Sequence, residues 1–187
     1  MCNLYRMEKA PEAIARLARA LSYPEGVPNF RPGDIRITEM APIVRSGAGA
    51  SWELVQRRWS WPGPHGKPVY NFRSEGRRFG ASRCLIVTDG FYEFTTPADP
   101  KQKRKDRWLF TLPDDGVFAI AGIWRDSAVG EAFTMLTTAP GPDVAPYHSR
   151  QVVVLQPAVW EQWLDPAADV GGLLVAAPAG TLSVAPA

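Results

Sequence analysis

The chain has 187 residues, 45% of them hydrophobic and 11% aromatic, which suffices for a sizeable core and favours one domain, or one domain with a tail. It shows no long apolar run and no basic-then-apolar leader, so we expect a soluble cytoplasmic protein rather than a membrane or secreted one. The net charge of +2 is uneven. Residues 1–110 carry 19 Lys/Arg against 11 Asp/Glu and residues 111–187 carry 2 against 8, which indicates either an anionic partner or an unevenly charged solvated surface.

The first predicted element is a helix over residues 11–21. Pro11 suits a first helical turn, and Ile14, Leu17 and Leu21 recur on one face. Residues 24–34 are rich in Pro, Gly and Asn and predict a loop.

Residues 43–70 contain three tryptophans and a turn-rich Pro-Gly segment, and their pattern assigns no element. From residue 83 onward the pattern is typical of short strands separated by turn signals such as Asp89-Gly90. The predicted strands are 84–88, 91–94, 108–112, 117–123, 133–137 and 151–155.

A short helix is predicted at Pro157–Leu164, and residues 176–187 are expected to be loosely ordered. The pattern contains no internal repeat and no natural domain boundary. We therefore expect a single domain over residues 1–187 of the α+β class, with a mainly antiparallel β-sheet or barrel-like core and peripheral helices.

Cys2 follows a methionine that aminopeptidases remove before small residues, so we expect the mature chain to begin with Cys2. Its α-amine would have a pKa near 8, which leaves roughly a tenth as free base at pH 7. An amine and a thiol on adjacent carbons condense with an aldehyde, first to an imine and then to a five-membered thiazolidine. Position alone also fits a small residue that is merely tolerated there.

Three further positions carry polar chemistry beside apolar segments. Asn71 offers a hydrogen-bond donor and an acceptor, and Arg73 offers a planar fork for phosphate, although the segment also reads as a polar surface loop. Glu93 lies in an apolar strand, on the same face as Phe91. A carboxylate there faces solvent, pairs with a cation, or lies buried with a raised pKa.

His148 stands where a loop enters the strand predicted at 151–155, a common place for catalytic groups, and the phosphate-capable Arg150 follows it. The alternative is an ordinary surface histidine. The basic run Lys101–Arg107 is interpreted as a solvated loop, with a position near DNA as the alternative.

The other motifs argue against bound cofactors. Two cysteines and two histidines at scattered spacing do not predict a zinc site, and there is no Gly-rich phosphate loop, so we expect neither a metal nor a cofactor. Cys84 opens an apolar strand and is predicted to be a core residue that forms no disulfide with Cys2.

The motifs are individually weak, but their order resembles that of the SOS-response-associated peptidase (SRAP) family over residues 2–164. The matching segments are Met-Cys-Asn-Leu-Tyr at the start, Asn-Phe-Arg-Ser-Glu at 71–75, Arg-Cys-Leu-Ile-Val at 83–87, Asp-Gly-Phe-Tyr-Glu-Phe at 89–94, Ala-Gly-Ile-Trp at 121–124, Thr-Thr-Ala at 137–139 and His-Ser-Arg at 148–150.

The resemblance implies a compact, barrel-like protein that crosslinks to abasic sites in single-stranded DNA, acting as a cytoplasmic, nucleoid-associated monomer in a bacterium. Cys2 would form a thiazolidine with the ring-opened sugar, and weak lyase activity would accompany the imine. The residues that match the family's pocket are Asn71, Glu93 and His148.

The resemblance also implies DNA contacts. Arg73 and Arg150 match residues that line the DNA channel, and we expect Trp59 and Trp61, from a shortened tryptophan motif, to stack on bases.

Two other functions remain open at this stage. One is a thiol peptidase that uses Cys2 as an N-terminal nucleophile, acting either on peptides or only on its own Met1. The other is a non-covalent single-strand binder in which Cys2 plays no part. A denaturing gel after incubation with abasic and intact single strands would separate the three.

Overall fold

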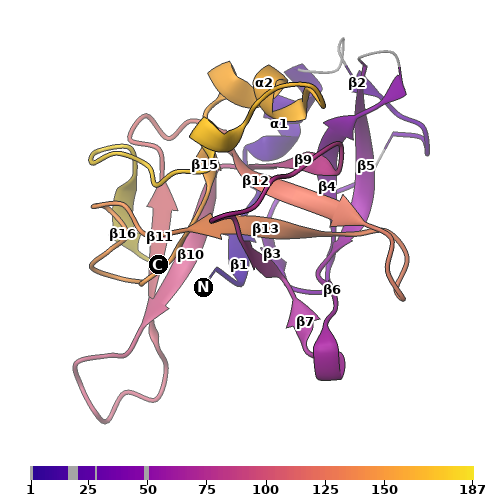
Figure 1. The fold of residues 1–187 in the computed structure, drawn as a ribbon. Coiled ribbons are helices and arrows are strands. Elements are labelled where there is room, and N and C mark those ends of the chain that lie inside the picture. Colours follow the sequence, from indigo (N-terminus) through magenta and orange to yellow (C-terminus); the bar gives the residue numbers. More distant parts are fainter. Residues whose placement is uncertain (1, 17–20, 28, 49–50) are drawn as a thin grey trace.

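The computed structural model describes residues 2–16, 21–27, 29–48 and 51–187 (Figure 1). Two short α-helices and several 3-10 turns lie around a β-rich body. The helical elements are α1 (Ala10–Arg16), η2 (Pro64–Gly66), η3 (Pro157–Val159), α2 (Trp160–Leu164) and η4 (Gly171–Leu173).

The larger sheet closes into a barrel. Its strands pair in the order β13–β12–β9–β4–β5, and a parallel pairing of β5 with β13 completes the ring. β2, β8, β14 and β15 extend this ring at its margins. The strands are β2 (Leu21–Ser22), β4 (Met40–Ser46), β5 (Trp52–Trp59), β8 (Asn71–Arg73), β9 (Arg83–Thr88), β12 (Phe118–Arg125), β13 (Ala132–Thr138), β14 (Gln151–Val152) and β15 (Val154–Leu155).

The second sheet is antiparallel and packs against the barrel. Its order is β16–β11–β10–β1–β3, so the first strand of the chain is an inner strand. The members are β1 (Leu4–Arg6), β3 (Asp34–Arg36), β10 (Gly90–Thr95), β11 (Asp106–Thr111) and β16 (Ser183–Pro186). A small hairpin of β6 (Trp61–Pro62) and β7 (Pro68–Val69) projects from the body.

One hydrophobic core joins the two sheets. Phe91 and Phe110 stack with their ring centroids 5.0 Å apart, and Phe118 from the barrel meets Phe91 edge-on. All three rings are completely buried. The inward face of β10 is therefore aromatic and closely packed, and any polar side chain on that face is desolvated.

The corner between β9 and β10 fixes the position of β1. The buried Asp89 carboxylate accepts hydrogen bonds from the backbone amides of Glu8 (2.8 Å) and Lys9 (3.3 Å) just before α1, and pairs with Arg6 at 2.8 Å. The backbone is closely packed at Gly90, where a Cβ would lie 3.1 Å from the Phe110 carbonyl oxygen and 2.8 Å from the end of the Leu109 side chain. The start of the chain is thus fastened to the strand that carries Glu93.

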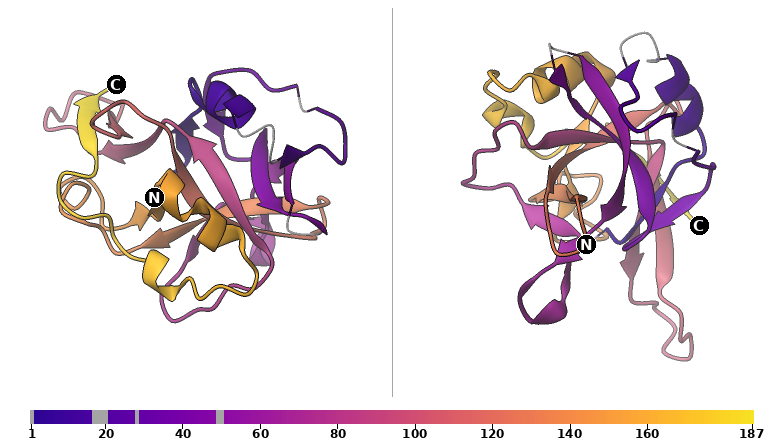
Figure 2. Two further views of the ribbon diagram at one scale, coloured as in Figure 1. Left: turned by 90° about the horizontal axis from the view of Figure 1, so that it is seen from above. Right: turned by 90° about the vertical axis from the view of Figure 1, so that its right-hand side faces the viewer.

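Helices α1 and α2 both lie toward the end of the barrel that is uppermost in Figure 1, and Figure 2 shows them apart from one another. At the opposite end, the loop between β10 and β11 and the β6–β7 hairpin project on either side of the start of β1 (Figure 1, Figure 2). No helix within the described ranges is long and apolar enough to cross a membrane.

The predicted α+β class with a barrel-like, mainly antiparallel core and peripheral helices is confirmed. The strands predicted after residue 83 are present as β9 to β13, and the helix predicted at Pro157–Leu164 is present as η3 followed by α2. The strand predicted at 151–155 is divided into β14 and β15, because Val152 pairs with β13 whereas Val154 pairs with β12.

Two predictions about the termini are wrong in part. Leu21 belongs to β2 rather than to the first helix, because it pairs with Trp52 of β5; residues 17–20 lie outside the described part. The segment 176–187 is not loosely ordered throughout, because Ser183–Pro186 pair with β11 as an edge strand. The unassigned stretch 43–70 contains most of β4 and all of β5 to β7.

Candidate functional site

Cys2 lies just before the inner strand β1 and is almost completely buried, with 1% of its surface exposed. Its thiol donates a hydrogen bond to the carbonyl of Leu4 at 3.2 Å. Burial, followed by the negative charge of Glu93, raises the pKa of the thiol well above its usual range. Cys2 is therefore held as a neutral thiol in a defined position.

Asn71 holds Cys2 from the barrel side. It begins β8, which pairs in parallel with β13, and its Nδ2 donates to the Cys2 carbonyl at 2.7 Å. The Asn71 Oδ1 is buried and accepts no hydrogen bond from a described residue. Such a buried acceptor is costly unless a ligand or water satisfies it, so Asn71 offers an acceptor beside Cys2.

Glu93 approaches Cys2 from the neighbouring strand. The register pairs Tyr5 with Phe91, so two residues further along the same ladder Asn3 lies opposite Glu93. Glu93 is 1% exposed, and desolvation raises its pKa to about 7. The positive charge of the amino terminus and, more weakly, a hydrogen bond from the Cys2 backbone oppose the rise. Of the three environments left open by the sequence, the structure selects burial with a raised pKa.

His148 completes the cluster from the loop before β14. Its Nε2 is 4.0 Å from Glu93 Oε2, and its Nδ1 lies 3.0 Å from both the amide nitrogen and the carbonyl oxygen of Arg150. Burial lowers the pKa of His148, and the positive charge of Lys105 adds to that effect. The imidazole is therefore mostly neutral at neutral pH, able to accept or donate a proton.

Glu93 and His148 border a cavity of about 340 Å³, which Asn3, Phe94 and Lys105 also line. Lys105 comes from the basic β10–β11 loop and brings a cation to the wall that carries Glu93 and His148. Phe94 brings a partly exposed aromatic ring next to Glu93. Neither Lys105 nor Phe94 was assigned a role from the sequence.

The two arginines expected to line a DNA channel lie near this cluster but differ in environment. Arg73 is exposed at the end of β8. Arg150 is half-buried, and its guanidinium binds both carboxylate oxygens of Glu75 and donates to the Thr137 carbonyl at 2.8 Å. The Glu75 pKa falls below its usual value because of the hydrogen bond from Arg150. Glu75 thus competes with any phosphate for Arg150.

The structure contradicts the predicted base stacking by two tryptophans. Trp59 is completely buried, packs edge-on against Tyr5 at 5.3 Å and donates its indole N–H to the Tyr70 carbonyl at 2.9 Å. Trp61 is 6% exposed, with the Arg125 guanidinium over its ring. Both rings serve the fold because the aromatic faces that a base would need are already covered.

The arrangement can perform proton transfer beside a nucleophile. Four residues from four separate segments, Cys2, Asn71, Glu93 and His148, meet at one end of the barrel. A carboxyl with a pKa about 7 suits acid and base roles near neutral pH. Within the described ranges no group of three or more His, Cys, Asp or Glu side chains is placed to hold a metal ion.

Comparisons with known proteins identify the family of this chain. The family model described as "SOS response associated peptidase (SRAP)" matches residues 1–186. The abasic site processing protein YobE of Bacillus subtilis (strain 168) is 32% identical over 92 residues, which are 46% of this chain and 41% of YobE. The match therefore spans less than half of that relative's length.

Crystal structures with the same fold come from two genera. A Bordetella bronchiseptica protein superposes with a TM-score of 0.78 at 25% identity, covering 100% of this chain and 99% of that one. A Bacteroides thetaiotaomicron protein gives 0.74 at 17% identity, covering 99% and 91%. A phage-related protein from Bordetella bronchiseptica gives 0.73 at 20% identity, covering 100% and 94%. With the family model matching nearly its entire length, the chain belongs to the SOS response associated peptidase (SRAP) family.

Proposed function

We propose that this protein captures abasic sites in single-stranded DNA covalently, through a thiazolidine on Cys2 once Met1 has been removed. The observation that carries the proposal is that Asn71 and Glu93, from two different strands, both form hydrogen bonds with the backbone of Cys2. A merely tolerated residue near a chain terminus needs no such restraint. The name of YobE, an abasic site processing protein, supports the choice of substrate.

The first step joins the Cys2 nitrogen to the aldehyde carbon of the ring-opened sugar. Removal of Met1 turns this nitrogen from an amide into a primary amine, and its backbone hydrogen bond already reaches Glu93. The amine adds to the carbonyl and gives a carbinolamine. Protonated Glu93 then gives a proton to the departing hydroxyl, which leaves as water, and an iminium ion remains beside the Glu93 carboxylate.

The second step closes the ring. The Cys2 thiol gives its proton to the carboxylate of Glu93, and the sulfur attacks the iminium carbon. The C=N electron pair moves onto the nitrogen, which already carries its proton, so a neutral thiazolidine forms and Glu93 is again protonated. Because burial keeps the thiol protonated, this step requires an adjacent base. One water is lost overall, and no oxidant or reductant is needed.

The remaining residues would position the sugar and its flanking strand. Asn71 Oδ1 would accept a hydrogen bond from the sugar hydroxyl or the new amine. His148 would favour the ring-opened sugar by exchanging a proton with its hydroxyl. Arg73, Lys105 and, after release from Glu75, Arg150 would bind phosphates, and Phe94 would contact a base.

A denaturing gel tests the proposal. The wild-type protein should give a shifted band with an abasic single strand and none with an intact strand. Cys2→Ala should give no band, and Cys2→Ser should give at most a labile adduct, because an oxazolidine is less stable. Intact mass spectrometry should show that the active protein begins at Cys2; active protein that retains Met1 would rule out the thiazolidine.

The same samples address a peptidase activity, which the family description suggests. Cleavage of peptide reporters without a DNA adduct would assign Cys2 to peptide hydrolysis. Binding without either reaction would indicate a non-covalent single-strand binder.

A further inference from the structure

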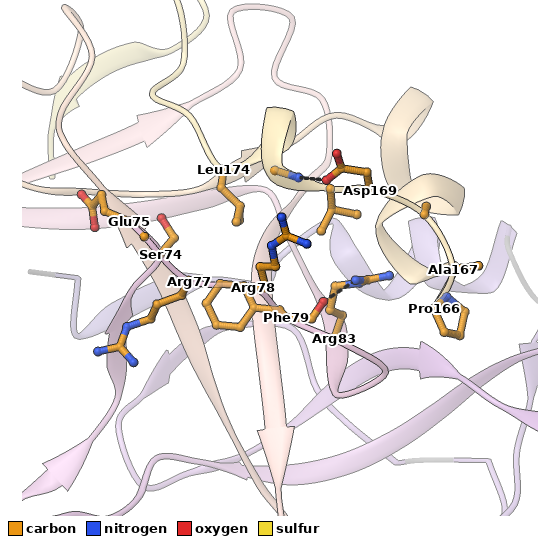
Figure 3. A pocket seen from close by; sticks show the side chains of 14 residues that line it. Ser74, Glu75, Arg77, Arg78, Phe79, Arg83, Pro166, Ala167, Asp169 and Leu174 are labelled. Carbon is orange, nitrogen blue, oxygen red and sulfur yellow. Dashed lines mark hydrogen bonds between the residues drawn. The ribbon is translucent and has the colours of Figure 1, made fainter.

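A second, larger cavity lies outside the cluster around Cys2. It has a volume of about 830 Å³ and opens between the loop that follows β8 and the segment from the end of α2 to η4 (Figure 3). Its lining contains three arginines, Arg77, Arg78 and Arg83, and two acidic residues, Glu75 and Asp169. The cavity is large enough to admit a nucleotide-sized group.

The acidic side chains of this cavity are already engaged. Glu75 binds Arg150, and that contact lowers its pKa. Asp169 accepts a hydrogen bond from the Gly171 backbone amide at 3.0 Å. Arg83 is 3% exposed and donates to the Trp163 carbonyl at 2.7 Å, so it contributes buried positive charge to the wall.

The two other arginines are exposed and available. No ion pair joins Arg77 or Arg78 to a carboxylate in the part of the chain that the structure describes. Arg77 lies at the rim on the side of Glu75, where its guanidinium stacks over Phe72 at 4.6 Å. Arg78 reaches into the middle of the cavity, toward the side of Leu174 (Figure 3).

The cavity is connected to the candidate site by two short paths. Along the chain, Arg73 at the end of β8 is followed directly by Ser74 and Glu75 of the lining. Through space, the contact between Glu75 and Arg150 leads to His148, two residues away. A strand bound at Arg73 and Arg150 would therefore pass the rim where Arg77 lies.

We infer that this cavity binds the phosphodiester backbone of the DNA that flanks the captured site, with Arg78 as the inner contact and Arg77 as the rim contact. Arginine forks suit phosphate oxygens, and the stacked ring of Phe72 orients one fork in advance. The choice of DNA as the ligand of this cavity rests on the proposed function. It adds a phosphate subsite that the chemistry at Cys2 does not require.

Fluorescence anisotropy with intact single strands of about 16 nucleotides tests the subsite, since single-strand-binding folds cover ~4–16 nucleotides. Arg77→Gln/Arg78→Gln should bind several-fold more weakly at low salt, with a salt slope smaller by up to about 1.4, or about 0.7 per lost contact. The matched control, Arg31→Gln/Lys67→Gln, removes two exposed charges elsewhere and should leave the slope unchanged.

A short abasic strand of about 4 nucleotides, the lower end of that range, should crosslink equally fast with wild type and with Arg77→Gln/Arg78→Gln. Equal salt slopes for that variant and the control would overturn the inference. If inorganic phosphate is the ligand instead, it should raise the melting temperature of the wild type but not of Arg77→Gln/Arg78→Gln, and the two proteins should bind DNA equally well. That result would overturn the inference in favour of free phosphate. Absence of crosslinking by wild type would instead defeat the proposed function, while the anisotropy result would still decide the subsite.

Discussion

Replacement of Glu93 by glutamine separates its acid–base role from its shape. Desolvation in the folded protein raises the pKa of Glu93 from 4.5 to about 7. Below pH 4.5 both the folded and the unfolded chain hold this proton. As the pH rises toward 7 the unfolded chain releases the proton first, so the wild type loses folding stability across this window.

The size of the loss follows from the two pKa values. Each pKa unit between the folded and unfolded states corresponds to about 1.4 kcal/mol, so ionisation of Glu93 should destabilise the fold by about 3 kcal/mol once the pH exceeds 7. Glu93→Gln has no such titration. The stability of the wild type relative to the variant should therefore fall by about 3 kcal/mol between pH ~4.5 and pH ~8.

Urea unfolding of both proteins over this pH range measures the difference directly, and other titrating groups cancel because both proteins contain them. Parallel time courses of crosslinking should show slower formation and slower reversal in Glu93→Gln, without the pH dependence of the wild type. If the unfolding free energies of the two proteins changed with pH in the same way, the raised pKa of Glu93 would be refuted. Coincident rate profiles would leave Glu93 a structural role and pass proton transfer to His148 or water.

The other predictions concern the residues around Glu93. Asn71→Ala should slow crosslinking more than it weakens binding to intact DNA, because Asn71 holds the Cys2 carbonyl and does not contact the DNA phosphates. Equal losses in both assays would indicate a folding defect. Lys105→Met should raise the pKa of His148, measured by NMR titration, whereas Lys101→Met on the same loop should not; identical titrations would place Lys105 away from the imidazole. Arg150→Ala should reduce the salt slope of single-strand binding by about 0.7. Adding Glu75→Gln to this variant should restore part of the DNA affinity, because it removes the carboxylate that Arg150→Ala leaves unpaired. If the double variant binds DNA no better than Arg150→Ala, Glu75 does not compete with phosphate.

The sequence predicts the strands that stand between clear turn signals. β9 is buried at all six positions, and the Asp89-Gly90 corner separates it from β10. β4 is different, because Pro42 within it argues against a strand until the pairing with β5 is known. The edge strand β16 is only four residues long and contains a proline, and only its ladder with β11 identifies it.

The candidate site is predictable to the extent that its residues stand in ordered motifs. The sequence contains no signal for the burial of Cys2 or for which cation of the β10–β11 loop reaches the cavity, since both depend on long-range packing. The contact between Glu75 and Arg150 joins residues 75 positions apart. The predicted stacking by Trp59 failed because the pattern does not reveal that its indole N–H is bound by the Tyr70 carbonyl.

The inner position of β1 has a consequence for the order of events during synthesis. β1 pairs with β10, so its second edge is satisfied only after residues 90–95 have left the ribosome, on the order of ten seconds later at ~5–20 residues per second. Until then Cys2 cannot be buried as it is in the finished fold. An aminopeptidase acting on the nascent chain would meet an open terminus, whereas one acting later would meet a residue with 1% of its surface exposed. The proposed removal of Met1 would therefore belong to the time of translation, and protein that folded before processing would not form the proposed crosslink.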